Sequence, residues 1–143
     1  MSLSIYTLDL RAPFMYSRNV MDDPFIQPIY YEEQIACFSL DKEACKAIEP
    51  DINQFLGPIL FTGIQTNEIQ EVEHCSIPKG LYLFAQLREF PNKELFTAMA
   101  LEVQKEGLWR GLSMEPIVFM RVLKEDDGLV TQVFRPISSN THK

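Results

Sequence analysis

Short segments in which apolar and polar residues alternate, or in which apolar residues run together, recur along this chain. Both patterns are typical of strands, because successive side chains of a strand point to opposite faces of a sheet. The first predicted strand bends at Pro13, and the last two are joined at Asp127-Gly128, a dipeptide typical of tight hairpin turns. The predicted strands are residues 3–10, 14–16, 59–66, 69–76, 81–87, 116–124 and 129–137.

One segment has the period of an amphipathic helix instead. Its apolar residues fall at positions i, i+3, i+4 and i+7, so they form one stripe that can pack on a sheet. Asn92, after Pro91, is a typical N-cap, and Gly107 is a typical C-terminal signal. The stripe consists of Phe96, Met99, Ala100 and Val103.

Residues 21–57 carry no dominant period, and two helices compete there. One would cover residues 29–38. The other would cover residues 42–48 behind a capping Asp41, and Pro50 would end it early. The pattern alone does not choose between them.

The composition is that of a soluble globular protein and fits a single domain spanning residues 1–143. Hydrophobic residues make up 46% of the chain and charged residues 23%. The net charge of −7, with no cluster of Lys and Arg, argues against direct nucleic-acid binding, because phosphate contact needs a basic face. No apolar run approaches the ~20 residues of a membrane-spanning helix, and the first residues lack the pattern of a signal peptide. We therefore expect a cytoplasmic protein that does not bind membranes.

The cysteines and histidines do not form a recognisable reactive or metal-binding motif. Cys37, Cys45 and Cys75 lack the spacing of metal ligands, and reduced thiols are the expected state. Cys75 follows His74, but neighbours on a strand point to opposite faces, so the two would not act as a pair. There is also no phosphate-binding loop and no nucleophile elbow. We expect no metal.

Glu115 is the residue that most clearly suggests a binding site. It stands between Met114 and the apolar start of the strand 116–124, and a carboxylate that loses solvation among apolar neighbours is stabilised by a bound cation. Aromatic rings strengthen such a site, because a cation over a ring face gains ~0.5–2 kcal/mol. The alternative is that Glu115 ends a strand in water.

Several aromatic residues are candidates for the same site. Trp109, in the connection after the predicted helix, either covers an edge of the core or forms a lid over a ligand. The candidates within predicted strands are Tyr82, Phe84, Phe119 and Phe134.

The order of these segments resembles a known family. Residues 59–138 resemble the gyrase-inhibitor-like small-molecule-binding domain, and within it the multidrug-binding effector domain of MerR-type transcription activators. The residues that carry the resemblance are Ile59-Leu60-Phe61-Thr62, then Ser76-Ile77-Pro78-Lys79-Gly80-Leu81-Tyr82, then Met114-Glu115 before the strand 116–124.

The resemblance implies an α+β fold of two duplicated strand–helix–strand–strand units. The units would form an antiparallel sheet with the helices on one face and a ligand groove between the halves. A short internal repeat agrees, since residues 57–61 read Gly-Pro-Ile-Leu-Phe and residues 115–119 read Glu-Pro-Ile-Val-Phe. In this family's pattern, Glu115 matches the acidic residue that engages the ligand, and Tyr82 matches a pocket tyrosine. Tyr30 or Tyr31 matches another pocket aromatic.

The function implied is that of a small-molecule binder. The helix-turn-helix segment of MerR-type and AraC-type regulators is missing, and the strand 129–137 has no tyrosine where drug-binding relatives have one. We therefore expect a stand-alone form that binds a lipophilic, cationic or aromatic molecule, or a sensor that acts through a transcription regulator or another protein partner.

Two other activities are known among proteins that resemble this fold. Some stand-alone members hydrolyse strained electrophilic natural products. In such an enzyme Glu115 would be the general base, and Tyr82 or Trp109 would position the substrate. A haem-binding family also resembles the fold, but only His74 and His142 could ligate the iron through histidine, and neither is well placed. We expect no cofactor.

Overall fold

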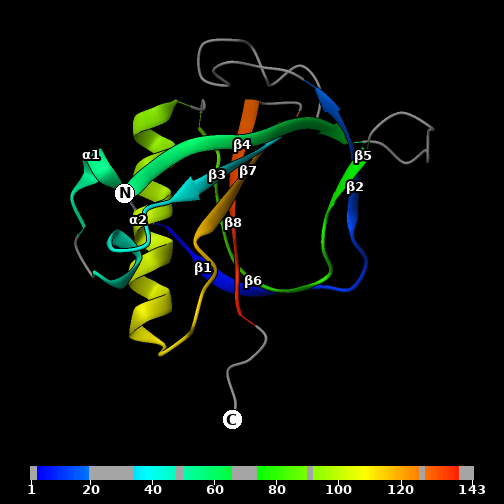
Figure 1. Ribbon diagram of the computed structural model, residues 1–143. Coiled ribbons are helices and arrows are strands. Elements are labelled where there is room, and N and C mark those ends of the chain that lie inside the picture. Colours follow the sequence, from blue (N-terminus) through cyan, green and yellow to red (C-terminus); the bar gives the residue numbers. More distant parts are fainter. Residues whose placement is uncertain are drawn as a thin grey trace.

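The computed structural model describes residues 3–19, 34–47, 50–65, 74–89, 92–125 and 128–138, and it is an α+β structure with one long helix (Figure 1). The helical elements are η1 (Ala44–Lys46), a 3₁₀ turn, α1 (Ile52–Phe55) and α2 (Lys93–Trp109). The strands are β1 (Ile5–Leu10), β2 (Phe14–Asn19), β3 (Gln34–Leu40), β4 (Leu56–Gln65), β5 (His74–Ile77), β6 (Gly80–Leu87), β7 (Ile117–Glu125) and β8 (Gly128–Pro136).

The strands form one antiparallel sheet in the order β1-β6-β8-β7-β3-β4-β2-β5. The first and last strands of this order, β1 and β5, lie next to each other at their C-terminal ends, because each continues into a strand at the opposite end of the sheet. Leu10 at the end of β1 pairs with Gly80, and Phe14 at the start of β2 pairs with Ile77. The bent segments β1–β2 and β5–β6 therefore pair along their length, and the sheet curls round on itself, as Figure 1 shows. Counted as one bent strand each, they reduce the eight segments to six strands.

The helix α2 covers one face of the sheet, as its apolar stripe predicted. All four stripe residues are buried, with exposed fractions of at most 1%. They pack on strand residues that share one face, because every second side chain of a strand points the same way. The strand residues in this cluster include Leu83, Ala85, Val118, Met120, Val122 and Val133.

The N-terminus of α2 is confirmed, but its end is not at Gly107. The Leu95 amide donates to Asn92 Oδ1 at 2.8 Å, so Asn92 is the N-cap. Gly107 lies inside the helix and is buried, and a side chain there would overlap that of Met114. The glycine that ends the helix is Gly111, with a φ of +73°. The amides of Gly111 and Leu112 donate to the carbonyls of Leu108 and Gly107, the two bonds of a Schellman motif.

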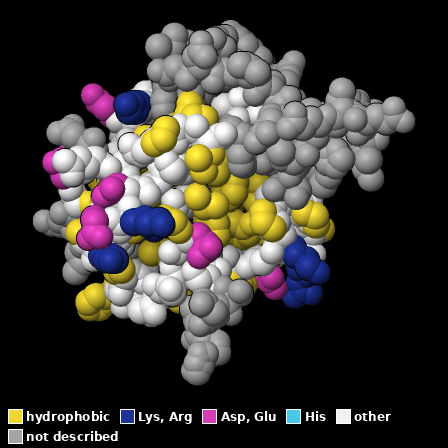
Figure 2. Space-filling view, viewed as in Figure 1, with side chains coloured by type: hydrophobic (Ala, Val, Ile, Leu, Met, Phe, Trp, Pro, Cys, Tyr) yellow, Lys and Arg dark blue, Asp and Glu magenta, His cyan; other side chains and the backbone are white. Residues whose placement is uncertain are grey.

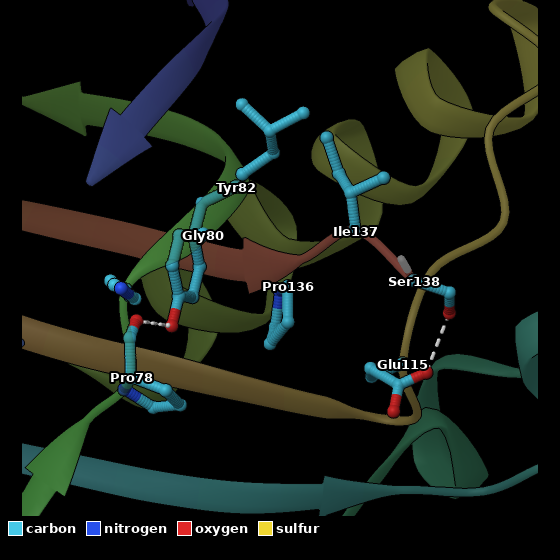
Figure 3. A pocket seen from close by; sticks show the side chains of 9 residues that line it. Pro78, Gly80, Tyr82, Glu115, Pro136, Ile137 and Ser138 are labelled. Carbon is cyan, nitrogen blue, oxygen red and sulfur yellow. Dashed lines mark hydrogen bonds between the residues drawn. The ribbon is translucent and has the colours of Figure 1, made fainter. Parts of the chain in front are cut away.

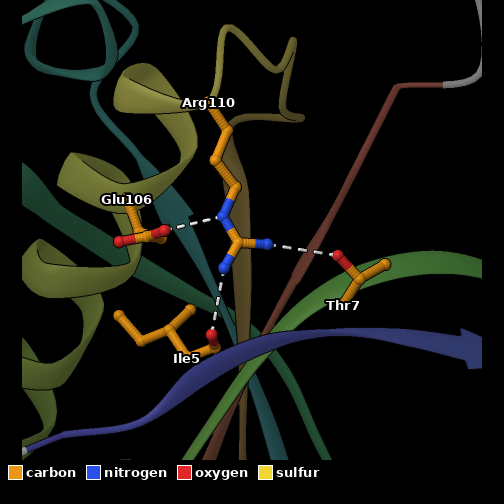
Figure 4. A network of polar contacts seen from close by, with 4 residues as sticks. All are labelled: Ile5, Thr7, Glu106 and Arg110. Atoms are coloured by element: carbon orange, nitrogen blue, oxygen red, sulfur yellow. Dashed lines mark hydrogen bonds and ion pairs between the residues drawn. The ribbon is translucent and has the colours of Figure 1, made fainter.

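Arg110, next to the end of α2, connects the helix to β1 (Figure 4). Its Nε donates to Glu106 Oε2 at 2.6 Å, and its two terminal nitrogens donate to Thr7 Oγ1 at 3.3 Å and the Ile5 carbonyl at 3.1 Å. These contacts hold the C-terminal end of α2 against the first strand. The segment that follows, residues 111–116, connects α2 to β7.

Neither helix predicted within residues 21–57 is present as written. Residues 34–38 belong to β3, so the helix over residues 29–38 is wrong in its second part, and residues 21–33 lie outside the described ranges. β3 runs between β4 and β7 and is buried on both faces, which produces a continuous apolar run instead of an alternating one. The helix over residues 42–48 is reduced to η1, although Asp41 Oδ2 does accept from the Ala44 amide at 3.0 Å.

The predicted strands of the second half are confirmed with small shifts. β6, β7 and β8 match the predicted strands 81–87, 116–124 and 129–137. The hairpin between β7 and β8 is also present, but Gly128 already pairs with Glu125 as the first residue of β8. The strand predicted over residues 69–76 is described only from His74 onward, as β5.

Candidate functional site

A pocket of about 490 Å³ lies where the corner between β5 and β6 meets the end of β8 and the residues before β7 (Figure 3). Glu115 and Tyr82, two of the residues that the resemblance placed in a ligand site, both line this pocket. Its other lining residues include Pro78, Lys79, Pro136 and Ser138. In Figure 3 the side chain of Pro136 stands between those of Tyr82 and Glu115.

Tyr82 is held rigidly at the pocket wall. The Tyr82 hydroxyl donates to the Pro78 carbonyl at 2.5 Å, across the bend between β5 and β6. In the sheet, Tyr82 of β6 is paired with Pro136 of β8. Only 2% of Tyr82 is exposed. Burial, and secondarily the nearby Cys37, raise the pKa of Tyr82 to about 12, so the phenol stays neutral across the physiological range.

Glu115 is fixed by two hydrogen bonds of its backbone, and its side chain is exposed. Its amide donates to the Pro136 carbonyl at 3.0 Å, and its own carbonyl accepts from Arg135 Nε at 3.0 Å. The carboxylate accepts one hydrogen bond, from Ser138 Oγ to Oε2 at 2.5 Å, and the residue is exposed. The expectation of a carboxylate tucked among aromatic rings is therefore wrong. Glu115 lies shortly before the first residue of β7, at the end of this central strand. Its side chain therefore lies at the rim of the pocket and not in the core.

The aromatic candidates on the strands form a packed cluster on the sheet face opposite α2. Tyr82 lies 6.4 Å from Phe119 and 6.3 Å from Phe134, measured between ring centroids, and Phe84 lies 4.9 Å from Phe134. All four rings are buried, and only Tyr82 also lines the pocket. Tyr82 thus joins the pocket to this group of four buried rings, here called the aromatic cluster. Figure 2 shows hydrophobic side chains gathered in the middle of the face that is turned to the viewer in Figure 1.

Trp109 is not part of this pocket. It is the last residue of α2 and is 87% exposed, and it lines a separate hollow with Leu3, Ile5 and Lys105. A lid over Glu115 and Tyr82 is therefore not formed by Trp109. Tyr30 and Tyr31 lie outside the described residues.

Of the pocket residues that were not predicted as site residues, Ser138 and Lys79 have polar side chains. Ser138 follows the last predicted strand, 129–137; its amide donates to the Ser113 carbonyl at 2.7 Å and its hydroxyl donates to the Glu115 carboxylate. A single serine near a chain end gives no signal of this role. Lys79 stands in the Ile-Pro-Lys-Gly corner and is exposed at the pocket, where it adds a positive charge.

Alkaline titration should report the environment of Tyr82. Because its pKa is raised in the folded protein, folding favours the protonated phenol; the stabilisation is complete below the unfolded value of about 10 and is lost as the pH rises toward about 12. Tyr82→Phe should cost about 1 kcal/mol at pH 8 through loss of the hydrogen bond to Pro78. We expect this difference, measured by urea unfolding of both proteins, to shrink above pH 10. A difference that stays constant up to the alkaline limit of folding would contradict the assignment.

The described residues contain neither a metal-type cluster of side chains nor a helix that could span a membrane. No group of three or more His, Cys, Asp or Glu side chains lies close enough to hold a metal ion there. None of the helices described is long and apolar enough to cross a membrane. Of the cysteines, Cys37 and Cys45 are free thiols, and burial raises the pKa of Cys37 to about 12.

Comparison with protein-family models and with curated protein sequences found no match to this chain.

Proposed function

We propose that this protein binds a small lipophilic molecule with a cationic or aromatic centre in the pocket of Glu115 and Tyr82. One observation carries the proposal. Glu115 and Tyr82 come from different strand ends, and both line one pocket, which Tyr82 connects to the aromatic cluster. The role is that of the effector-binding domain of a multidrug-responsive transcription regulator in stand-alone form, which reports occupancy to a protein partner.

The surface of the pocket suits an amphipathic ligand. Pro78, Leu81, Pro136 and Ile137 offer apolar contact, while charge is confined to Glu115 and Lys79. Because Glu115 is exposed, its attraction for a cation is limited to about 1 kcal/mol at 4 Å in water and rises as the ligand excludes solvent. Most of the binding energy would then come from apolar contact, and the carboxylate would provide selectivity for positive charge.

The pairing pattern supports a duplicated architecture as part of the proposal. β2, β4 and β3 are neighbours in that order, just as β6, β8 and β7 are, and the two sets meet at the β3–β7 pair. Each set follows the chain order strand, connection, strand, strand. α2 is the connection in the second set, and residues 20–33, outside the described ranges, occupy the equivalent position in the first. This pattern makes β3 the counterpart of β7, whereas the short sequence repeat had paired residues 57–61 of β4 with the start of β7.

The test is a titration with a fluorescent lipophilic cation. Glu115→Gln keeps the shape of the side chain and its contact with Ser138 but removes the charge, and we expect the dissociation constant to rise about ten-fold, which corresponds to about 1.4 kcal/mol. Glu94→Gln, on an exposed carboxylate in the first turn of α2, is the matched control and should leave binding unchanged. Equal affinity of the Glu115 variant and the wild-type protein would reject Glu115 as the residue that reads charge.

A hydrolase acting on strained electrophilic natural products is the second candidate. The observation that favours it is the exposed carboxylate of Glu115 at the rim of the pocket, since water can reach a general base placed there. Incubation with a reactive cyclopropane compound distinguishes the two functions. Time-dependent loss that is abolished in Glu115→Gln would establish hydrolysis, whereas an intact compound leaves binding as the function.

A further inference from the structure

A second hollow, of about 520 Å³, lies between η1 and the connection from α2 to β7. It faces the other side of the strand ends that carry the ligand pocket. Met114 and Pro116 line this hollow whereas Glu115 lines the pocket, and Arg135 lines it whereas Pro136 lines the pocket. This alternation follows from the extended backbone, whose neighbouring side chains point to opposite faces.

The hollow contains three basic side chains. Its lining residues include Lys42, Lys46 and Arg135, together with Cys45 and Ser113, and no acidic residue is among them. Lys46 does contact Glu43, at 3.7 Å, but both side chains are more than 70% exposed, so this ion pair is weak. The chain as a whole has a net charge of −7, so three basic side chains around one hollow form a local charge of the opposite sign.

Arg135 lies at the floor of the hollow and is only 1% exposed. Its Nε donates to the Glu115 carbonyl at 3.0 Å, and its terminal nitrogens donate to Gln104 Oε1 at 2.5 Å and Cys45 Sγ at 3.2 Å. None of these three acceptors is a carboxylate. A buried cation without an opposite charge is costly, because the protein interior solvates it poorly. Burial accordingly lowers the pKa of Arg135, against the opposing effect of Cys45.

The contact with Cys45 is the weakest of the three. Sulfur is a poor acceptor, and a guanidinium has more N–H donors than these bonds use. Cys45 is half-buried and lines the hollow, so an anion entering there could replace its sulfur as the acceptor for Arg135. An oxyanion would give Arg135 shorter, charge-assisted hydrogen bonds in place of a thiol contact.

We propose that this hollow binds a small, doubly charged oxyanion, with Arg135 beneath it and Lys42 and Lys46 at its rim. The chemistry shared by phosphate and dicarboxylate ligands fits the basic side chains, and the apolar residues Leu108, Leu112 and Met114 form part of the wall beside them. The proposal does not depend on the ligand assigned to the pocket of Glu115 and Tyr82.

The experiment compares inorganic phosphate and succinate with sodium chloride at equal ionic strength. Thermal unfolding and isothermal titration are measured for the wild-type protein, for Lys42→Gln/Lys46→Gln, and for Lys93→Gln/Lys105→Gln, which removes the same charge elsewhere on the surface. Alkylation of each cysteine by iodoacetamide is followed by peptide mass spectrometry. Arg135→Met is included as the variant that removes the central cation.

We expect phosphate or succinate to raise the melting temperature above the chloride control and to slow alkylation of Cys45 several-fold. A preference for phosphate or for succinate identifies which oxyanion the hollow selects. Lys42→Gln/Lys46→Gln should weaken the binding about ten-fold, while the control pair should bind as the wild-type protein does. The proposal is overturned if neither anion differs from chloride, or if the two lysine pairs lose affinity equally. Because both lysine variants change only exposed or half-exposed side chains, this comparison decides the question even if Arg135→Met does not fold.

Discussion

Phe96→Ala is expected to lower the free energy of unfolding by about 3–5 kcal/mol, the range for removing a large aromatic side chain from a packed core. Phe96 has no exposed surface, and its ring centroid lies 5.0 Å from that of Phe38 on β3. The contact joins α2 to the middle of the sheet. The cavity that Phe96→Ala creates there therefore cannot be filled by a shift of one flexible side chain. Urea unfolding at neutral pH measures the change in the free energy of unfolding, with the same dependence on urea concentration (the m-value) fitted to both proteins.

A conservative replacement at the same position separates packing from helix stability. Phe96→Leu retains an apolar side chain and a good helix former, and it should cost less than half as much as the alanine variant. A loss below 1 kcal/mol for Phe96→Ala would show that α2 does not depend on this contact with the sheet.

Gln104→Leu is expected to destabilise the protein by about 2–4 kcal/mol, because it leaves several buried polar groups without partners at once. Gln104 is fully buried although it lies on the helix. Its Nε2 donates to the carbonyls of Ala44 at 2.6 Å and Ala47 at 2.8 Å, and its Oε1 accepts from Arg135. Leucine has a similar size, so a cavity contributes little and the cost measures the lost hydrogen bonds.

Thermal and urea unfolding of Gln104→Leu provide the measurement. Lys105→Leu, at the next and partly exposed helix position, introduces the same residue without breaking this network and should change stability by less than about 0.5 kcal/mol. If the two leucine variants were equally stable, the hydrogen bonds of Gln104 would contribute nothing net to folding.

The helix α2 was predictable because only one of its faces is buried, and Asn92 marks its start by local chemistry. The middle parts of β6, β7 and β8 are buried on both faces, and these strands were predictable as apolar runs bounded by the turn residues Gly80, Pro116 and Asp127-Gly128. β3 is also buried on both faces, since Ile35, Ala36, Cys37 and Phe38 are all buried, but its apolar run was assigned to a helix. Periodicity alone does not distinguish a fully buried strand from a buried helix.

The pocket was predictable only as far as its two named residues. Tyr82 and Glu115 do line one cavity, but the exposure of Glu115 depends on where the chain enters β7, which no local pattern specifies. The basic hollow gave no sequence signal at all. Cys45 and Arg135, which line it, and Gln104, which accepts a hydrogen bond from Arg135, come from three distant segments and meet only in the folded chain.

The hydrogen bond from Arg135 Nε to the Glu115 carbonyl connects the two faces of one short backbone segment. An anion that reorients the guanidinium would shift that carbonyl, and with it the carboxylate on the other side. By thermodynamic reciprocity, any influence of the anion on the affinity for the lipophilic molecule must be matched by an equal influence in return. A sensor with this arrangement would respond to its effector in proportion to the anion concentration around it, and so would combine two chemical inputs in one output.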